Sequence, residues 1–180
     1  MRVADYIISY IYDRMRVNTI FMVSGGGIMH LTDAIACHGK IKYVCSNNEQ
    51  ATSMEADGFA KINRTFGVAL VTSGPGATNA ITGVVGAWQD SSSVVVLSGQ
   101  SKVKQTISYA GLSGLRQFGI QEVNIVPMVS FCTKYAAMID DPMKIRYHLD
   151  KAVYLSKHGR PGPVWLDIPL DIQSAPVDPK

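Results

Sequence analysis

Residues 66–79 read Phe-Gly-Val-Ala-Leu-Val-Thr-Ser-Gly-Pro-Gly-Ala-Thr-Asn. The run from Phe66 to Val71 is apolar and unbroken, as in a strand buried on both faces. Two glycines and a proline follow, and residues 77–88 then have the small and apolar side chains of a packed helix. A buried strand that turns directly into a helix is typical of a βαβ unit, in which the next strand lies parallel to the first.

The same alternation continues on both sides of this stretch. The pattern predicts strands over residues 19–23, 41–45, 66–71, 93–97, 133–139 and 163–168. It predicts helices over residues 3–15, 28–37, 48–62, 77–88, 122–129 and 142–157, and a long loop over 98–120. With right-handed crossovers, this order predicts an α/β fold with a doubly wound, mostly parallel six-stranded sheet and helices on both faces.

The composition bounds the classes of function. The chain has 180 residues, 47% hydrophobic and 17% charged, which suits one globular domain. Its net charge of +3 comes from scattered basic residues, so we expect no nucleic-acid partner. Cys37, Cys45 and Cys132 have no metal-ligand spacing, and we expect no metal on this chain. No run approaches the roughly 18 apolar residues of a membrane span, so we expect no membrane contact and a cytoplasmic location.

The last eight residues differ in composition from the rest. Residues 1–172 carry the alternating elements, whereas 173–180 read Gln-Ser-Ala-Pro-Val-Asp-Pro-Lys. We expect 1–172 to form the domain and 173–180 to form an exposed linker to a missing or separate domain.

Ligands of open α/β sheets bind beyond the carboxyl ends of the strands. Glycine-rich and small polar segments occupy that edge at 24–27, 46–49, 72–79 and 99–121. Gly25-Gly26-Gly27 does not match a dinucleotide fingerprint, and a tight turn explains it equally well. Segment 72–79 could hold an anion at its helix start, but it lacks the Lys-Ser/Thr of a phosphate-binding loop. It therefore suits the edge of a neutral ring at least as well.

Glu49 stands at the mouth of the sheet, just before a predicted helix. A carboxylate in the first helical turn is stabilised by the helix dipole, which is one explanation for it. The other is a general acid or base whose pKa is tuned by burial.

Taken together, these segments resemble the N-terminal pyrimidine-binding domain of thiamine-diphosphate-dependent enzymes, in the acetolactate synthase and pyruvate oxidase branch. The resemblance covers about residues 1–172 and implies a flavodoxin-like thiamine-diphosphate-binding fold. It rests on the ordered stretches 25–29, 48–51, 56–60, 72–79, 98–100, 121–122 and 160–164.

The resemblance implies a role for each site residue. Glu49 would be the glutamate that bonds N1′ of the cofactor's aminopyrimidine, and Gln121 would lie at the approach to the reacting carbon, so both are predicted catalytic residues. The predicted cofactor-binding residues are Val23, Ser24, Gly25, Glu49, Thr72, Pro75, Gly76 and Asn79.

Two departures from acetolactate synthases point to a sub-branch. Val23-Ser24 replaces their usual Tyr-Pro, and the loop over 101–120 is longer than theirs. Residues 114–122 are more similar to synthase-like proteins of surface-polysaccharide and modified-sugar pathways, in which the acyl acceptor could be a ketosugar nucleotide.

The family's diphosphate-binding Gly-Asp-Gly stretch does not occur here. The resemblance therefore implies that this chain holds only the pyrimidine end of thiamine diphosphate, with Mg²⁺, and in some members of the family FAD, on absent domains. It implies the proton-relay half of a 2-oxo-acid carboligase or decarboxylase acting on an acid such as pyruvate, with the isolated chain inactive. Its partner would be a diphosphate-binding domain, in cis or as a separate subunit. The alternative is a non-catalytic interaction or regulatory module that retains the fold; a nucleotide-binding flavodoxin-like protein lacks any fingerprint.

We also expect a homodimer. The predicted helices 48–62 and 77–88 are rich in small residues, which permit close helix packing, and the resemblance places both at a subunit interface.

Overall fold

The computed structural model describes residues 1–178 and contains one six-stranded sheet in which every strand pair is parallel. The strand order is β2-β1-β3-β4-β6-β5. The strands are β1 (Thr19–Met22), β2 (Lys42–Cys45), β3 (Gly67–Val71), β4 (Val94–Gln100), β5 (Tyr135–Met138) and β6 (Val164–Pro169). The predicted fold class is confirmed.

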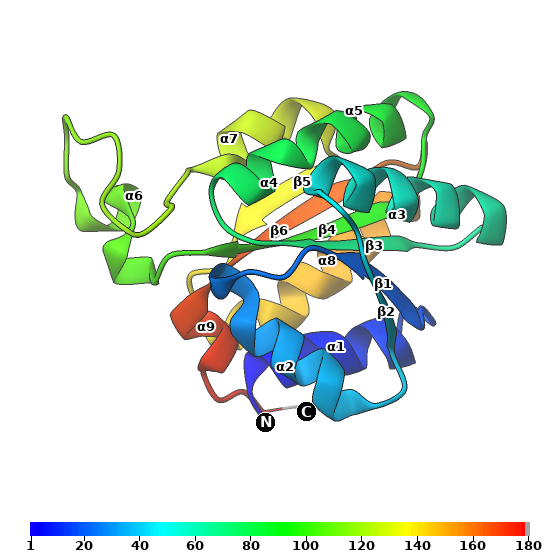
Figure 1. The fold of residues 1–180 in the computed structure, drawn as a ribbon, viewed down its shortest axis with the longest axis horizontal. Coiled ribbons are helices and arrows are strands. Elements are labelled where there is room, and N and C mark those ends of the chain that lie inside the picture. Colours follow the sequence, from blue (N-terminus) through cyan, green and yellow to red (C-terminus); the bar gives the residue numbers. More distant parts are fainter. Residues whose placement is uncertain (179–180) are drawn as a thin grey trace.

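Helices cover both faces of the sheet (Figure 1). One layer holds α3 (Glu49–Asn63), α4 (Pro75–Asn79), α5 (Ile81–Gln89) and α7 (Ile125–Val129). The other holds α1 (Val3–Asp13), α2 (Met29–His38), α8 (Ile145–Lys157) and α9 (Leu170–Ser174). Single 3-10 turns lie at η1 (Gly26–Ile28), η2 (Val103–Gln105), η3 (Ser130–Cys132) and η4 (Pro142–Lys144). Residues 101–124, between β4 and α7, form an excursion of the chain beyond the sheet, which contains α6 (Ile107–Ala110).

Strand β3 shows why the chain folds in three layers. All five of its residues are buried. Val68 and Leu70 face the core cluster under α1, α2 and α8, while Ala69 and Val71 face the cluster under α3, α5 and α7. Alternate side chains of a strand point to opposite faces, so an unbroken apolar run needs a helical layer on each side.

Three predicted elements differ in the structure. The single helix predicted over 77–88 is two helices, α4 and α5, that meet at Ala80. The loop predicted over 98–120 contains the end of β4, η2 and α6, because Ser98 and Gln100 pair with β6. The helix predicted over 122–129 begins only at Ile125, since Glu122 is held by amides of the excursion instead.

The predicted exposure of the tail is wrong for part of it. Gln173 lies in α9 and is fully buried, and Val177 is buried as well. The amide of Val3 donates to Ala175 O at 2.9 Å, and that of Val177 donates to Met1 O at 2.9 Å. The tail is therefore hydrogen-bonded to the N-terminal residues, beside which it lies in Figure 1. Residues 179–180 of the predicted linker lie outside the described residues.

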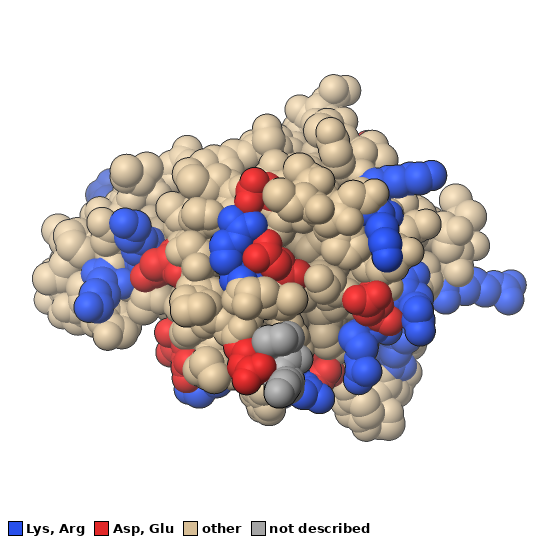
Figure 2. All heavy atoms as spheres, turned by 90° about the horizontal axis from the view of Figure 1, so that it is seen from below, with Lys and Arg blue, Asp and Glu red and all other residues tan. Residues whose placement is uncertain are grey.

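Figure 2 shows the face covered by α1, α2, α8 and α9, where basic and acidic side chains are interspersed. Arg2 accordingly pairs with Asp5 and Asp33, each at 2.7 Å. Within residues 1–178, no helix combines the length and the apolar character that a membrane crossing requires.

Gly67 and Gly58 provide a matched test of the packing between β3 and α3. A Cβ at Gly67 would overlap the carbonyl of Ala56, whereas one at Gly58 would have no atom within 4 Å. We expect Gly67→Ala to lower the free energy of unfolding by about 1–3 kcal/mol through overpacking. Gly58→Ala, inside α3, should raise it by about 0.5–1 kcal/mol. Urea denaturation of both variants measures the difference, and equal stabilities would contradict this packing.

Candidate functional site

The strand order places a switch point between β1 and β3. After β1 the chain turns through η1 into α2 on one face, and after β3 it turns into α4 on the other. The two connections diverge at the carboxyl edge, where open α/β sheets bind ligands. They stay linked there by the amide of Gly27, which donates to Thr72 Oγ1 at 3.2 Å.

Glycines let these connections approach one another closely. A Cβ on Gly76 would lie 2.6 Å from Thr72 Cγ2 and 3.2 Å from Glu49 Oε1. A Cβ on Gly27 would lie 2.8 Å from Ser73 Oγ. These distances are shorter than normal van der Waals contacts, so a larger residue at Gly27 would push the two connections apart, and one at Gly76 would clash with Thr72 in its own connection and crowd Glu49 of α3. The glycines are therefore needed for the close approach as well as for the turns.

Glu49 is the first residue of α3. The preceding Asn48 caps the helix by accepting the amide of Ala51 at 2.9 Å. Glu49 Oε2 accepts a hydrogen bond of 2.8 Å from Asn79 Nδ2, at the end of α4. The side chain is partly buried, and its Oε1 lies toward Gly76. Glu49 therefore lies in the first helical turn, where the helix dipole favours a carboxylate, and its side chain is also anchored by Asn79.

Gln121 lies beside Gly74, which is in the turn that leads from β3 to α4. Its φ of 54° is in the left-handed region, which non-glycine residues rarely adopt. A Cβ on Gly74, itself at φ 60°, would overlap the Gln121 carbonyl. Ser101 Oγ donates to Ile120 O at 2.8 Å, and Gln100 Nε2 donates to Val123 O at 2.7 Å. Gln121 is therefore fixed from both sides in the chain.

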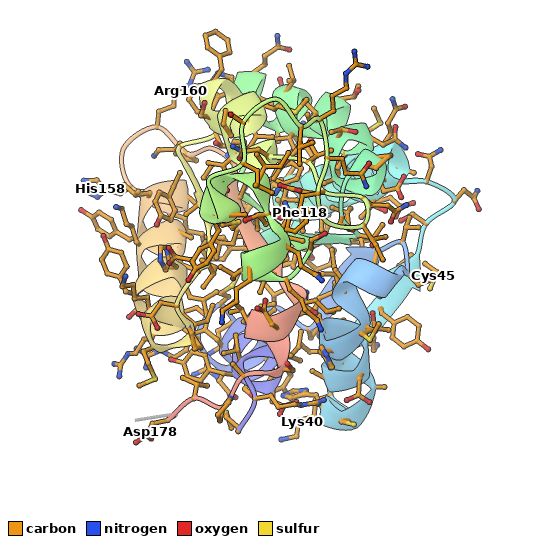
Figure 3. All side chains as sticks on the ribbon, turned by 90° about the vertical axis from the view of Figure 1, so that its left-hand side faces the viewer. Lys40, Cys45, Phe118, His158, Arg160 and Asp178 are labelled. Carbon is orange, nitrogen blue, oxygen red and sulfur yellow. The ribbon has the colours of Figure 1, made fainter. Side chains whose placement is uncertain are left out.

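The excursion between β4 and α7 is organised by one buried carboxylate. Glu122 accepts hydrogen bonds from the amides of Ile107 (2.6 Å), Phe118 (2.9 Å) and Gly119 (3.0 Å). In Figure 3 the carboxyl edge faces the viewer, with Phe118 of the excursion near its centre and Cys45 at the end of β2 to one side. The sequence did not predict that Glu122 organises this segment. The signal that could have indicated it is a carboxylate next to a glycine-rich loop.

A pocket of about 400 Å³ lies between η1 and the excursion. Most of its polar side chains carry no charge, and Lys102 is the one ionisable residue among those that line it. The lining residues are Gly26, Gly27, Met29, Ser73, Gln100, Ser101, Lys102, Gln105, Ile120, Gln121 and Leu170. Gln121 thus faces a cavity, while Glu49 lies outside its lining.

The remaining predicted site residues occupy the same edge with fewer contacts. The amide of Val23 donates to Leu70 O at 3.3 Å, and Gly25 contacts Thr72 closely. Ser24 and Pro75 are exposed, and Pro75 is the first residue of α4. Among the described residues, no group of three or more His, Cys, Asp or Glu side chains could hold a metal ion.

Comparison with known proteins agrees with this geometry. The family model described as "Thiamine pyrophosphate enzyme, N-terminal TPP binding domain" matches residues 1–128. The acetolactate synthase isozyme 3 large subunit of Escherichia coli is 38% identical over 169 residues, which are 94% of this chain and 28% of that protein. The acetolactate synthase large subunit of Lactococcus lactis is 37% identical over 161 residues, 89% of this chain and 26% of that protein.

A eukaryotic relative matches to a similar extent. The mitochondrial acetolactate synthase catalytic subunit of Saccharomyces cerevisiae is 33% identical over 169 residues, 94% of this chain and 23% of that protein. The chain thus spans about a quarter of the length of these relatives. It belongs to the thiamine pyrophosphate enzyme family and corresponds to the N-terminal TPP binding domain of acetolactate synthase-like enzymes.

Proposed function

We propose that this chain is the pyrimidine-binding, proton-relay half of a thiamine-diphosphate-dependent 2-oxo-acid carboligase or decarboxylase. The observation that carries the proposal is the Glu49–Asn79 hydrogen bond at the switch point, next to glycines that let the backbone segments of this edge pack closely together. An ionisable side chain thus stands beside Gly76 and Thr72, with its orientation set by Asn79.

The residues present fit an aminopyrimidine. Such a ring is flat, carries hydrogen-bond donors and acceptors on its edge, and needs a close backbone approach. Gly25, Gly27 and Gly76 hold the backbone of this edge close to Thr72 and Ser73, where a Cβ would clash, while a Cβ at Gly26 would have no atom within 4 Å. Glu49 provides the carboxyl group that a ring nitrogen can share a proton with. No metal-binding cluster competes for this edge in residues 1–178.

Thiamine diphosphate supplies the carbon nucleophile and the electron sink for loss of CO₂ from a 2-oxo acid. Glu49 would hold the proton that is shared with N1′ of the pyrimidine. Asn79 occupies Oε2 and so fixes the carboxyl group, which leaves Oε1 to exchange that proton. Val23, Ser24, Thr72 and Pro75 would border the ring, and Gln121 would orient the substrate from the pocket.

The reaction partners follow from the relatives and from what this chain lacks. The relatives are acetolactate synthases, two of them named as large subunits, so we propose pyruvate or a related 2-oxo acid as donor. The diphosphate and Mg²⁺, and FAD if it is present, would be bound by a diphosphate-binding partner domain in cis or on another subunit. The length of the excursion and Val23-Ser24 support the branch that uses modified sugars, with a ketosugar nucleotide as acceptor.

A non-catalytic module that retained the fold is the second candidate. Such a module would have no need for a carboxylate anchored by Asn79 or for a Gln121 backbone held in the left-handed region. The geometry of both residues therefore favours the catalytic proposal.

The proposed homodimer rests on α3 and α5. Several of their small residues are buried within the chain itself; a Cβ at Gly83 would overlap Ser53 Oγ, so these residues serve the α3–α5 contact. The outer surface of the two helices still exposes Met54, Ile62, Val85 and Trp88. We propose that this apolar surface, of the kind that marks protein interfaces, contacts a second copy.

Glu49→Gln tests the proton relay. The substituted amide could still accept the Asn79 hydrogen bond but could not hold the proton, so we expect turnover by the full-length enzyme, or by this chain with its diphosphate-binding partner, to fall at least about a hundredfold. Thermal unfolding should stay near that of the wild type.

Glu55→Gln is the matched control for this experiment. Glu55 lies on the same helix but accepts its hydrogen bond from Ser46 Oγ, at 2.6 Å. Its substitution should leave turnover unchanged. Wild-type turnover in Glu49→Gln would refute the assignment of the relay.

Cofactor binding by the isolated chain tests whether it binds only the pyrimidine end, with the diphosphate and Mg²⁺ bound by a partner domain. Calorimetry of this chain with thiamine diphosphate should show weak binding that does not depend on Mg²⁺, because no described cluster can hold the metal. Tight binding that requires Mg²⁺ would show that the diphosphate site is on this chain.

Light scattering tests the dimer. We expect a mass about twice the 19.5 kDa of one chain. Val85→Lys, on the outer surface of α5, should shift the mass toward the monomer, while Met143→Lys, on η4 and away from that surface, should leave it unchanged. A wild-type mass of one chain at high concentration would exclude the dimer.

A further inference from the structure

Asp167 carries a buried carboxyl group on β6, the strand that lies between β4 and the edge strand β5. It lies on β6 at 1% exposure, and its oxygens accept hydrogen bonds from Ser98 Oγ at 2.6 Å and Gln100 Nε2 at 2.9 Å. Burial raises the pKa of this carboxyl to about 7, partly opposed by the two hydrogen bonds. An apolar residue would fill this position at a lower desolvation cost, so the carboxyl calls for an explanation.

The surroundings of Asp167 contain no compensating charge. On β4 it meets Ser98 and Gln100, and on β5 its register partner is Met138. Helix α7, which packs on the same face, has the sequence Ile-Val-Pro-Met-Val. In the segment just before α7, the nearest acidic residue is Glu122, whose carboxylate accepts hydrogen bonds from backbone amides of the excursion. Within the described residues, Asp167 forms no ion pair with any Lys, Arg or His.

Gln100 connects this carboxyl to the functional edge. One Nε2 hydrogen bond goes to Asp167 Oδ2 and the other to Val123 O, at 2.7 Å, while Oε1 accepts the amide of Ser101 at 3.0 Å. Both donors and the acceptor of the amide group are therefore used. The acceptor oxygen of Asp167 fixes the orientation of the Gln100 side-chain amide, with Nε2 directed at Val123 O. If this amide were rotated by half a turn, Gln100 Oε1 would face the oxygens of Asp167 and Val123, and neither of them can donate a hydrogen bond.

The backbone carbonyls that Gln100 and Ser101 bind lie on either side of Gln121 in the chain. Gln100 grips Val123 on one side of it, and Ser101 grips Ile120 on the other. Left-handed conformations of non-glycine residues persist only where the surroundings over-determine them. The φ of 54° at Gln121 is such a conformation, and it places the residue at the pocket that Gln100 and Gln121 both line.

We propose that Asp167 is a positioning residue that acts through Gln100: the chain Asp167–Gln100–Val123 holds Gln121 in its left-handed conformation at the pocket. The proposal rests on the proposed function only for what Gln121 does toward a substrate. The positioning itself is a property of this chain.

Two substitutions at position 167 separate positioning from general stability. Asp167→Leu has a similar shape but offers no acceptor, so Gln100 loses its orientation. Asp167→Asn can still present Oδ1 to Gln100 Nε2 and Nδ2 to Ser98 Oγ. We expect amide hydrogen exchange over residues 119–123 to be at least about tenfold faster in Asp167→Leu, and to return to the wild-type rate in Asp167→Asn.

Trp165→Phe is the matched control. Trp165 Nε1 donates to Ser98 Oγ at 2.8 Å, from the same strand and the same depth, but it forms no hydrogen bond with Gln100. This variant should unfold at a lower temperature and keep its protection over residues 119–123. Equal loosening of that segment in Asp167→Leu and Asp167→Asn, or none in Asp167→Leu, would overturn the proposal.

A second measurement needs no variant that must fold. The amide chemical shifts of Gln121 and Val123 in the wild type should titrate with a midpoint near the pKa of about 7 of Asp167. Because the folded pKa lies above the ordinary value of 3.8, the stability that Asp167 contributes should be greatest below pH 3.8 and decline as the pH rises through about 7. Shifts that are flat over this range would overturn the proposal. Neither readout depends on catalysis, so wild-type turnover in Glu49→Gln would sink the proposed function and leave this test intact.

Discussion

The divergence of the chain between β1 and β3 is the constraint on which the site depends. Two adjacent parallel strands must send their continuations to opposite faces, and this opens an edge between η1 and α4. The Gly27–Thr72 hydrogen bond closes the backbone across that edge, and the Glu49–Asn79 hydrogen bond joins the start of α3 to the end of α4. The same parallel sheet buries both faces of β3 and β4, so the rigidity that orients these side chains comes from the core itself.

The repeating elements could be predicted because each depends on local sequence. Phe66–Val71 is apolar throughout, and a run of that kind has few places to go except the centre of a sheet. The position of Glu49 just after a predicted strand indicated a helix start. The resemblance implied that its carboxyl group bonds the aminopyrimidine ring of the cofactor. The closeness of Asn79 to Glu49 could not be derived from spacing, because it depends on how α4 ends against α3.

What escaped prediction depends on contacts between distant segments. The break at Ala80 leaves no composition signal, since both helices are built of the same small residues. The order in the excursion comes from Glu122 bonding amides up to 15 positions away. The left-handed backbone at Gln121 needs Gly74, Gln100 and Ser101, which reach it from two other segments. Such a conformation is imposed by the surrounding tertiary structure and not by the preference of the residue that adopts it.

The pairing of the two ends has a mechanical consequence. Met1 bonds Val177 and Val3 bonds Ala175 in an antiparallel arrangement, with Arg2 bridged to Pro176 between them. A force that pulls the ends apart would load these bonds one after another, as in a zip, and not all together in shear. The seam would yield first, while the hydrogen bonds between the parallel strands remain unloaded. Beyond this seam, a force on the C-terminal end would reach the functional edge through α9, where Gln173 Nε2 donates to Gly27 O at 2.7 Å.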